Sequence, residues 1–76
     1  MKVDKNGNRY TEIELGWDNK SNDLIRITEI KNEQTVRLSK IDPRGKVFPG
    51  PEPAITKIPE LIETLIRIYI DNKNEK

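Results

Sequence analysis

All five prolines of this chain lie between residues 43 and 59, and they divide the sequence into two parts with different periodicities. Proline has no backbone N–H and a fixed φ, so Pro49, Pro51 and Pro53 hold the chain extended and keep it out of a central strand. Before this segment, apolar and polar residues alternate as in half-buried strands; after it, apolar residues recur at helical spacing. The sequence therefore predicts several strands followed by one C-terminal helix.

Three segments before the prolines have the composition of strands. Ile13, Leu15 and Trp17 alternate with polar residues in the first, and β-branched residues are frequent in the other two; the three segments are residues 11–17, 23–30 and 35–41. A four-residue connection between the last two favours an antiparallel hairpin. The simplest register pairs residue 26 with 39 and residue 28 with 37, which places Arg26 and Arg37 on one face.

The strand at 35–41 runs into a strong turn signal, Asp42-Pro43-Arg44-Gly45. Because proline presets φ and glycine accepts positive φ, we expect Gly45 to have a positive φ in a hairpin turn. The chain then resumes a strand at Lys46-Val47-Phe48, and Ala54-Ile55-Thr56 is a candidate for a further short edge strand.

The predicted fold class is α+β, with a three- to four-stranded curved antiparallel sheet followed by one C-terminal helix packed on one face. Residues 10–71 form a single domain in this interpretation. Residues 1–9 are a flexible lead-in or at most a short edge strand, and residues 72–76 are a frayed tail.

The helix begins near Pro59, which suits a first turn, and Glu60 suits the positive end of the helix dipole. Its apolar arc is wider than one sheet requires. A chain of 76 residues has a thin core, and the absence of cysteine excludes disulfides as reinforcement. A homodimer is therefore expected, with an interface formed by Leu61, Leu65, Ile68 and Tyr69.

Catalysis is not expected, because the sequence contains neither histidine nor cysteine and its carboxylates are explained as solvated surface. No metal-binding spacing or phosphate-cradling glycine loop is present, so no metal and no cofactor are expected. The apolar stretch 58–70 contains charged residues and is too short to span a membrane. A cytoplasmic location is expected from the lack of cysteine.

Basic and aromatic residues of the predicted hairpin suggest nucleic-acid binding. We expect phosphate contacts from basic residues, and stacking of a base on Phe48 or Trp17; the basic residues are Arg26, Arg37, Lys40, Arg44 and Lys46. The alternative is that the arginines are a polar outer face and that Trp17 packs in the core. The net charge of +1 is not that of a strong duplex-DNA binder.

The segment Asp42-Pro43-Arg44-Gly45-Lys46-Val47-Phe48-Pro49-Gly50, followed by Ala54-Ile55-Thr56 and Pro59-Glu60-Leu61, resembles the PC4-type transcriptional coactivators. The resemblance covers about residues 36–68. It implies a homodimer of curved four-stranded sheets, with helices at the dimer interface and a basic and aromatic ridge that grips single-stranded DNA. Arg37 falls where that family has a ligand-binding arginine, whereas Lys40 replaces an aromatic residue, and Phe48 and Glu52 replace lysines.

Two functions follow as hypotheses. The first is sequence-tolerant binding of single-stranded DNA or RNA by a homodimeric sheet domain, in transcription or replication. The second is a small protein-binding adaptor or inhibitor, of the kind that phages and mobile elements encode, which would use the same sheet or the helix flank.

Overall fold

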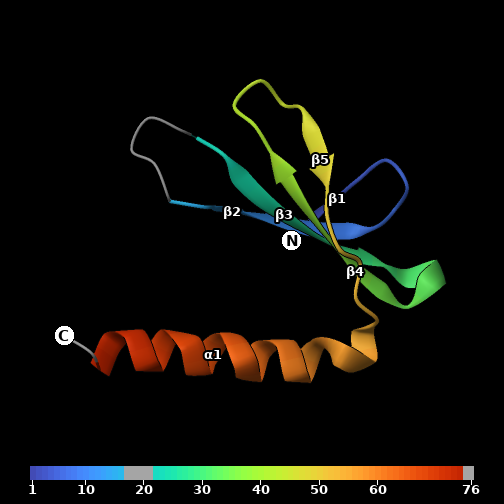
Figure 1. The fold of residues 1–76 in the computed structure, drawn as a ribbon. Helices are drawn as coiled ribbons and strands as arrows, with labels where there is room; N and C mark the ends of the chain where they lie inside the picture. Colours follow the sequence, from blue (N-terminus) through green and yellow to red (C-terminus); the bar gives the residue numbers. More distant parts are fainter. Residues whose placement is uncertain (17–21, 75–76) are drawn as a thin grey trace.

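The computed structural model describes residues 1–16 and 22–74. Its sheet is antiparallel and contains five strands in sequence order, and one long helix follows it (Figure 1). The strands are β1 (Lys2–Val3), β2 (Arg9–Glu14), β3 (Leu24–Ile30), β4 (Thr35–Ile41) and β5 (Val47–Pro49), and the helix is α1 (Ile58–Asn74). The α+β class is confirmed, with five strands instead of three or four.

The central hairpin, β3–β4, has the predicted register. Arg26 pairs with Ser39 and Thr28 with Arg37, so the two arginines share a face. A short 3₁₀ turn joins the strands, η1 (Lys31–Glu33), and Gln34 closes it with a left-handed φ of 56°. This conformation returns the chain directly into β4.

The first predicted strand, at residues 11–17, begins earlier and ends earlier in the structure. The segment expected at 11–17 forms β2 from Arg9 to Glu14, and Trp17 lies outside the described residues. Of the alternatives for residues 1–9, the edge strand is present, because Lys2 pairs with Tyr10. The intervening turn is closed by Asp4, whose Oδ1 accepts hydrogen bonds from the backbone amides of Asn6 and Asn8, both at 2.9 Å.

The β4–β5 turn also has the predicted conformation, with Gly45 at a φ of 87°. Asp42 fixes this turn from its first position. Its Oδ1 accepts hydrogen bonds from the backbone amides of Arg44 and Lys46, at 3.0 and 2.8 Å.

The proline segment follows the edge of β4 beyond β5. Backbone amides of Val36 and Leu38 donate to the carbonyl oxygens of Pro53 and Pro51, at 2.9 and 3.0 Å. Prolines suit this edge, because a residue without an N–H can still accept. The expected strand at 54–56 is wrong. Only Ala54 forms a bridge, and the chain then turns as a 3₁₀ helix, η2 (Ile55–Lys57), into α1.

A one-residue bulge lies within this edge. Ser39 pairs with Pro49 and Thr35 with Ala54, so the outer segment contains one residue more than β4 over the same length. Gly50 lies at this point. A Cβ there would be 2.5 Å from the carbonyl oxygen of Leu38, so the close approach requires glycine.

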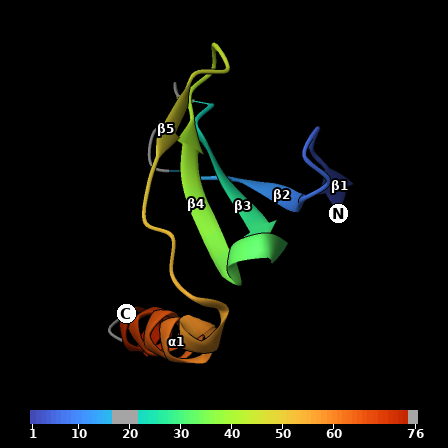
Figure 2. The same cartoon turned by 90° about the vertical axis from the view of Figure 1, so that its right-hand side faces the viewer.

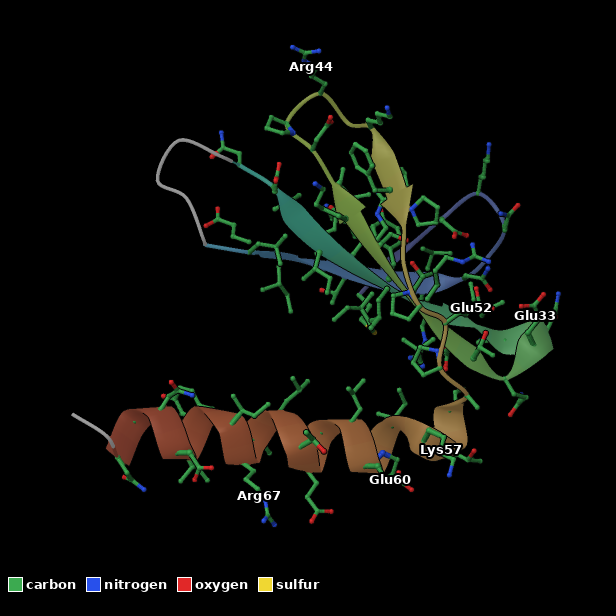
Figure 3. All side chains as sticks on the ribbon, viewed as in Figure 1. Glu33, Arg44, Glu52, Lys57, Glu60 and Arg67 are labelled. Carbon is green, nitrogen blue, oxygen red and sulfur yellow. The ribbon has the colours of Figure 1, made fainter. Side chains whose placement is uncertain are left out.

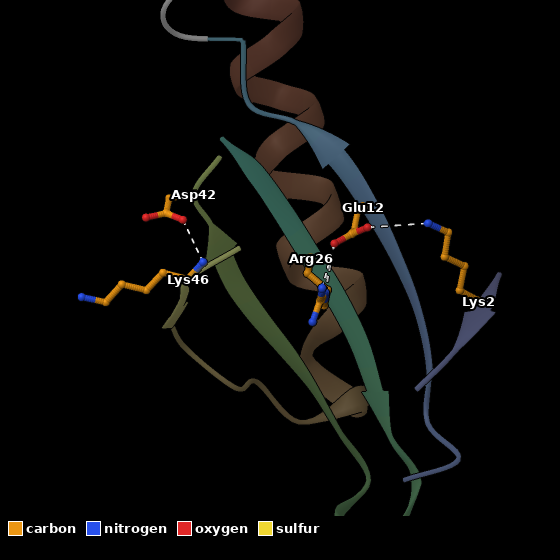
Figure 4. A network of polar contacts seen from close by, with 5 residues as sticks. All are labelled: Lys2, Glu12, Arg26, Asp42 and Lys46. Carbon is orange, nitrogen blue, oxygen red and sulfur yellow. Dashed lines mark hydrogen bonds and ion pairs between the residues drawn. The ribbon is translucent and has the colours of Figure 1, made fainter. Parts of the chain in front are cut away.

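The sheet has two faces of different character. The apolar sheet face contains Ile13, Ile25, Ile27, Leu38 and Phe48; the polar sheet face contains Tyr10, Glu12, Arg26, Thr28, Arg37 and Ser39 at its centre, with the buried Ile30 and Ile41 toward its ends. The apolar sheet face is on the helix side, because its Leu38 lines a hollow together with Leu61 of α1. In Figure 4 the polar sheet face is toward the viewer and α1 is behind the sheet.

The helix is not packed on the sheet as predicted. Figure 2 shows α1 below the sheet, joined to it through the 50–57 segment. The exposed fractions of Ile62, Leu65 and Tyr69 are 50, 56 and 67%. The prediction fails because the connecting segment holds α1 away from the apolar sheet face and nothing else in the described chain covers the helix.

The end of the helix also differs from the expectation. Residues 72–74 were expected to begin a frayed tail, but α1 continues through Asn74. The Nδ2 of Asn72 donates to the carbonyl oxygen of Ile68, one turn earlier in the helix, at 2.8 Å.

Candidate nucleic-acid interface

The β4–β5 hairpin brings cations and an aromatic ring together. Lys40 pairs with Phe48 across the strands, and its Nζ lies 4.6 Å from the centre of the ring. The Nζ of Lys46 lies 5.0 Å from the same centre. Phe48 is 37% exposed, so part of its ring remains accessible, although both ammonium groups lie over it. We call Lys40, Arg44, Lys46 and Phe48 the hairpin cluster.

The cations of the hairpin cluster have no acidic partner in the part of the chain that the structure describes. Within residues 1–16 and 22–74, no carboxylate forms an ion pair with Lys40, Arg44 or Lys46. Asp42 lies in the same turn, but its hydrogen bonds are to backbone amides. Arg44 projects from the tip of the hairpin into solvent (Figure 3). Three cations are therefore available to an external anion.

Arg26, in contrast, is engaged on the polar sheet face. Its Nε and Nη2 donate to Glu12 Oε2 at 3.1 and 2.9 Å, and Lys2 approaches the other oxygen of that carboxylate at 3.8 Å (Figure 4). The guanidinium also lies 4.9 Å from the centre of the Tyr10 ring. Its charge is already compensated, and its planar face is covered by an aromatic ring.

Arg37 is held in a similar way by Glu52. Its Nε donates to Glu52 Oε1 at 2.8 Å, and the Thr35 hydroxyl donates to Oε2 at 2.8 Å. These hydrogen bonds, first that of Arg37, lower the pKa of Glu52. The carboxyl group of Glu33 lies next to that of Glu52 (Figure 3). A hydrogen bond between the two carboxyl groups, and the repulsion between them, raise the pKa of Glu33.

The structure thus divides the predicted binding residues between two faces. Lys40, Lys46 and Phe48 belong to the hairpin cluster, with Arg44 at its tip, while Arg26 and Arg37 lie on the polar sheet face with carboxylate partners. Trp17 lies outside the described residues. Sequence reasoning missed the pairing of Glu12 with Arg26. The alternation of residues 11–17 identified the side of Glu12, but only the β2–β3 register identified its neighbour.

An apolar hollow adjoins Phe48 on the apolar sheet face. It has a volume of about 470 Å³ and is lined by Leu15, Ile25, the segments 38–40 and 49–51, and Phe48. This volume is in the range of small-molecule sites, roughly 300–1,000 Å³. The bulge at Gly50 forms one wall, and Lys40 places an ammonium group among otherwise mostly apolar side chains.

No group of three or more acidic, histidine or cysteine residues suited to a metal ion occurs in the described part of the chain. Across the same residues, no helix combines the length and the apolar character required to cross a membrane.

Comparisons with known proteins gave no relative: no protein-family model, curated protein or solved structure matches this chain.

Proposed function

We propose that this protein is a binding protein rather than an enzyme, and that it binds single-stranded nucleic acid without reading its sequence. The supporting observation is the hairpin cluster, in which two ammonium groups lie over a partly exposed aromatic ring and have no carboxylate partner among residues 1–16 and 22–74. Cations bind backbone phosphates, and an aromatic ring stacks on any base. The resemblance to PC4-type coactivators points to the same ligand class.

A single strand fits this surface better than a duplex. The net charge is only +1, so the many phosphate contacts that sustain duplex binding are lacking. Phe48 can contribute stacking energy only when a base face is exposed, which is the state of an unpaired strand. A few cations and one ring per chain suit a ligand that offers both phosphates and bases.

We propose further that the protein is a homodimer through α1. The accessible surface of the chain is 6395 Å², whereas a folded monomer of 8.9 kDa is expected to expose about 4,800 Å². The radius of gyration is 14.2 Å, against about 11 Å expected for this length. The excess surface exceeds the roughly 800 Å² that each partner buries in a standard interface.

The position of the helix supports a second copy as its partner. Arg67 points away from the sheet (Figure 3), so the opposite side of α1, with Leu65 and Tyr69, faces the apolar sheet face. Two apolar surfaces of one chain thus face each other without closing. A second copy contributes an identical helix, and a symmetric pair would cover the exposed helix face in both chains.

A salt titration tests the nucleic-acid proposal. Fluorescence anisotropy of labelled oligo(dT), compared with a duplex of equal length, is expected to show tighter binding of the single strand at low salt. Affinity should fall linearly on logarithmic axes as salt increases, because each phosphate contact releases a counterion. Failure of the single strand to bind at low salt would rule out the proposal.

We place the protein in the cytoplasm, where a chain without cysteine needs no oxidising conditions.

The second candidate function is binding of a different protein, and the exposed α1 face favours it, with Ile62, Leu65, Ile66 and Ile68 all at least half exposed. Mass in solution separates the two uses of this face. A dimer at micromolar concentration assigns the face to a second copy, and a monomer leaves it for another protein.

A further inference from the structure

We infer that the hollow beside Phe48 holds one unstacked base of the bound strand, with Lys40 and Lys46 on the adjoining phosphates. This inference rests on the proposed function and extends it from an open stacking surface to a base-sized subsite. The observation that carries it is the juxtaposition of an apolar hollow of about 470 Å³ with an accessible ring and two ammonium groups.

The walls of the hollow suit the flat faces of a base. Ile25 and Leu38 come from neighbouring strands of the apolar sheet face, and Leu15 continues the same alternation beyond β2. Phe48 supplies an aromatic surface at one side. A base placed there removes apolar side chains and its own ring faces from water, while its polar edge stays at the open side.

The bulge shapes the remaining wall. Pro49 pairs with Ser39, and the carbonyl oxygen of Pro51 accepts from the Leu38 amide. The extra residue of the outer segment therefore lies at Gly50, between these two edge contacts. Gly50 approaches the Leu38 carbonyl so closely that a Cβ would be 2.5 Å away. The wall therefore lacks a side chain at the point where it meets the sheet.

The charges identify the ligand as a nucleotide unit in preference to a neutral apolar molecule. Lys40 lines the hollow, and its Nζ lies 4.6 Å from the ring centre of Phe48, with Lys46 at 5.0 Å. No carboxylate pairs with either ammonium group in the described residues. A phosphate joined to a base through one sugar satisfies both parts of the site at once.

The test compares two strands with the same phosphates. Labelled oligo(dT) is titrated beside a strand of equal length in which every nucleotide is an abasic tetrahydrofuran unit. We expect oligo(dT) to bind at least about 5-fold more tightly, since stacking of one base contributes about 1–3 kcal/mol. Equal affinity overturns the base subsite and the stacking on Phe48, but leaves single-strand binding through the phosphates intact. Failure of both strands to bind at low salt overturns the proposed function itself.

Variants of the hollow test which residues cause the preference for oligo(dT) over the abasic strand. Phe48→Leu keeps an apolar side chain but removes the aromatic face, so the preference for oligo(dT) should fall below about 3-fold with an unchanged salt slope. Phe48→Tyr should retain the preference. Lys40→Gln should weaken both strands equally and preserve their ratio. Circular dichroism confirms that each variant is folded; a folded Phe48→Leu protein with full discrimination would place the base elsewhere and overturn the inference.

Discussion

Lys40 and Phe48 are direct partners across β4 and β5, and the lysine Nζ lies 4.6 Å from the centre of the phenylalanine ring. This relationship joins the two kinds of contact that an unpaired strand requires, one to phosphate and one to a base. It also separates the hairpin cluster from Arg26 and Arg37, which lie on the other face and already have carboxylate partners.

Removing a cation from the hairpin cluster should flatten the salt dependence of binding. Lys46→Gln is expected to weaken oligo(dT) binding and to reduce the slope of log affinity against log salt by about one. Arg37→Ala is the matched variant on the polar sheet face. Its slope should not change, because Glu52 already compensates this guanidinium at 2.8 Å. The opposite pattern, with a flattened slope only for Arg37→Ala, would assign the ligand to the polar sheet face.

A charge on the exposed face of α1 should dissociate the homodimer. Leu65→Glu and Ile68→Glu each place a carboxylate in the proposed apolar interface, where an unpaired charge is costly. Sedimentation at tens of micromolar should give twice 8.9 kDa for the wild type and 8.9 kDa for these variants. Arg67→Glu is the control on the side of the helix away from the sheet, and it should remain a dimer. A monomeric wild type would contradict the prediction.

Two glycines should respond to alanine for different reasons. At Gly45 the cost is conformational, because its φ is 87° and nothing lies near the added Cβ; we expect a loss of about 1 kcal/mol in the free energy of unfolding. At Gly50 the cost is a steric clash with the Leu38 carbonyl, and the loss should be larger. Urea unfolding measures both. Arg44→Ala, in the same turn as Gly45, should change the free energy by less than about 0.5 kcal/mol.

The carboxyl pair Glu33–Glu52 should make stability depend on pH. The pKa of Glu33 is raised by its hydrogen bond to Glu52 and by repulsion from it, so folding favours the protonated form. That contribution is fully present below the pKa of Glu33 in the unfolded chain, and it is lost as pH rises through the higher pKa of the folded state. The Gln side chain of Glu33→Gln carries no charge at any pH, so this variant does not lose that stability as pH rises. Its melting temperature relative to the wild type should therefore be higher at neutral pH than in acid.

The pair gives a matched comparison, because the pKa of Glu52 is shifted in the opposite direction. Hydrogen bonds from Arg37 and Thr35 lower it, so this stabilisation is present above the pKa of unfolded Glu52 and is lost as pH falls through the lower folded value. Glu52→Gln should destabilise the protein at neutral pH, with a smaller effect in acid. Glu14→Gln serves as the surface control. Parallel pH profiles for Glu33→Gln and Glu52→Gln would contradict this account.

Local patterns in the sequence were sufficient for the hairpins. The composition of residues 35–41 predicted β4 with its observed bounds, and four connecting residues predicted the register that pairs Thr28 with Arg37. The Asp-Pro-x-Gly signal predicted the positive φ of Gly45. These features depend on backbone preferences over a few residues, and such preferences are encoded by the residues themselves.

Longer-range relationships were decided only by the tertiary structure. The sequence determined that Arg26 and Arg37 share a face, but the β2–β3 register and the bulged proline edge brought Glu12 and Glu52 against them. Likewise, the sequence determined that α1 is apolar over a wide arc, while the segment 50–57 decided that the helix does not close onto the apolar sheet face. The physical reason is the same in each case. Ion pairing and burial depend on which distant segments meet, whereas the periodicity of one segment determines only which of its side chains point the same way.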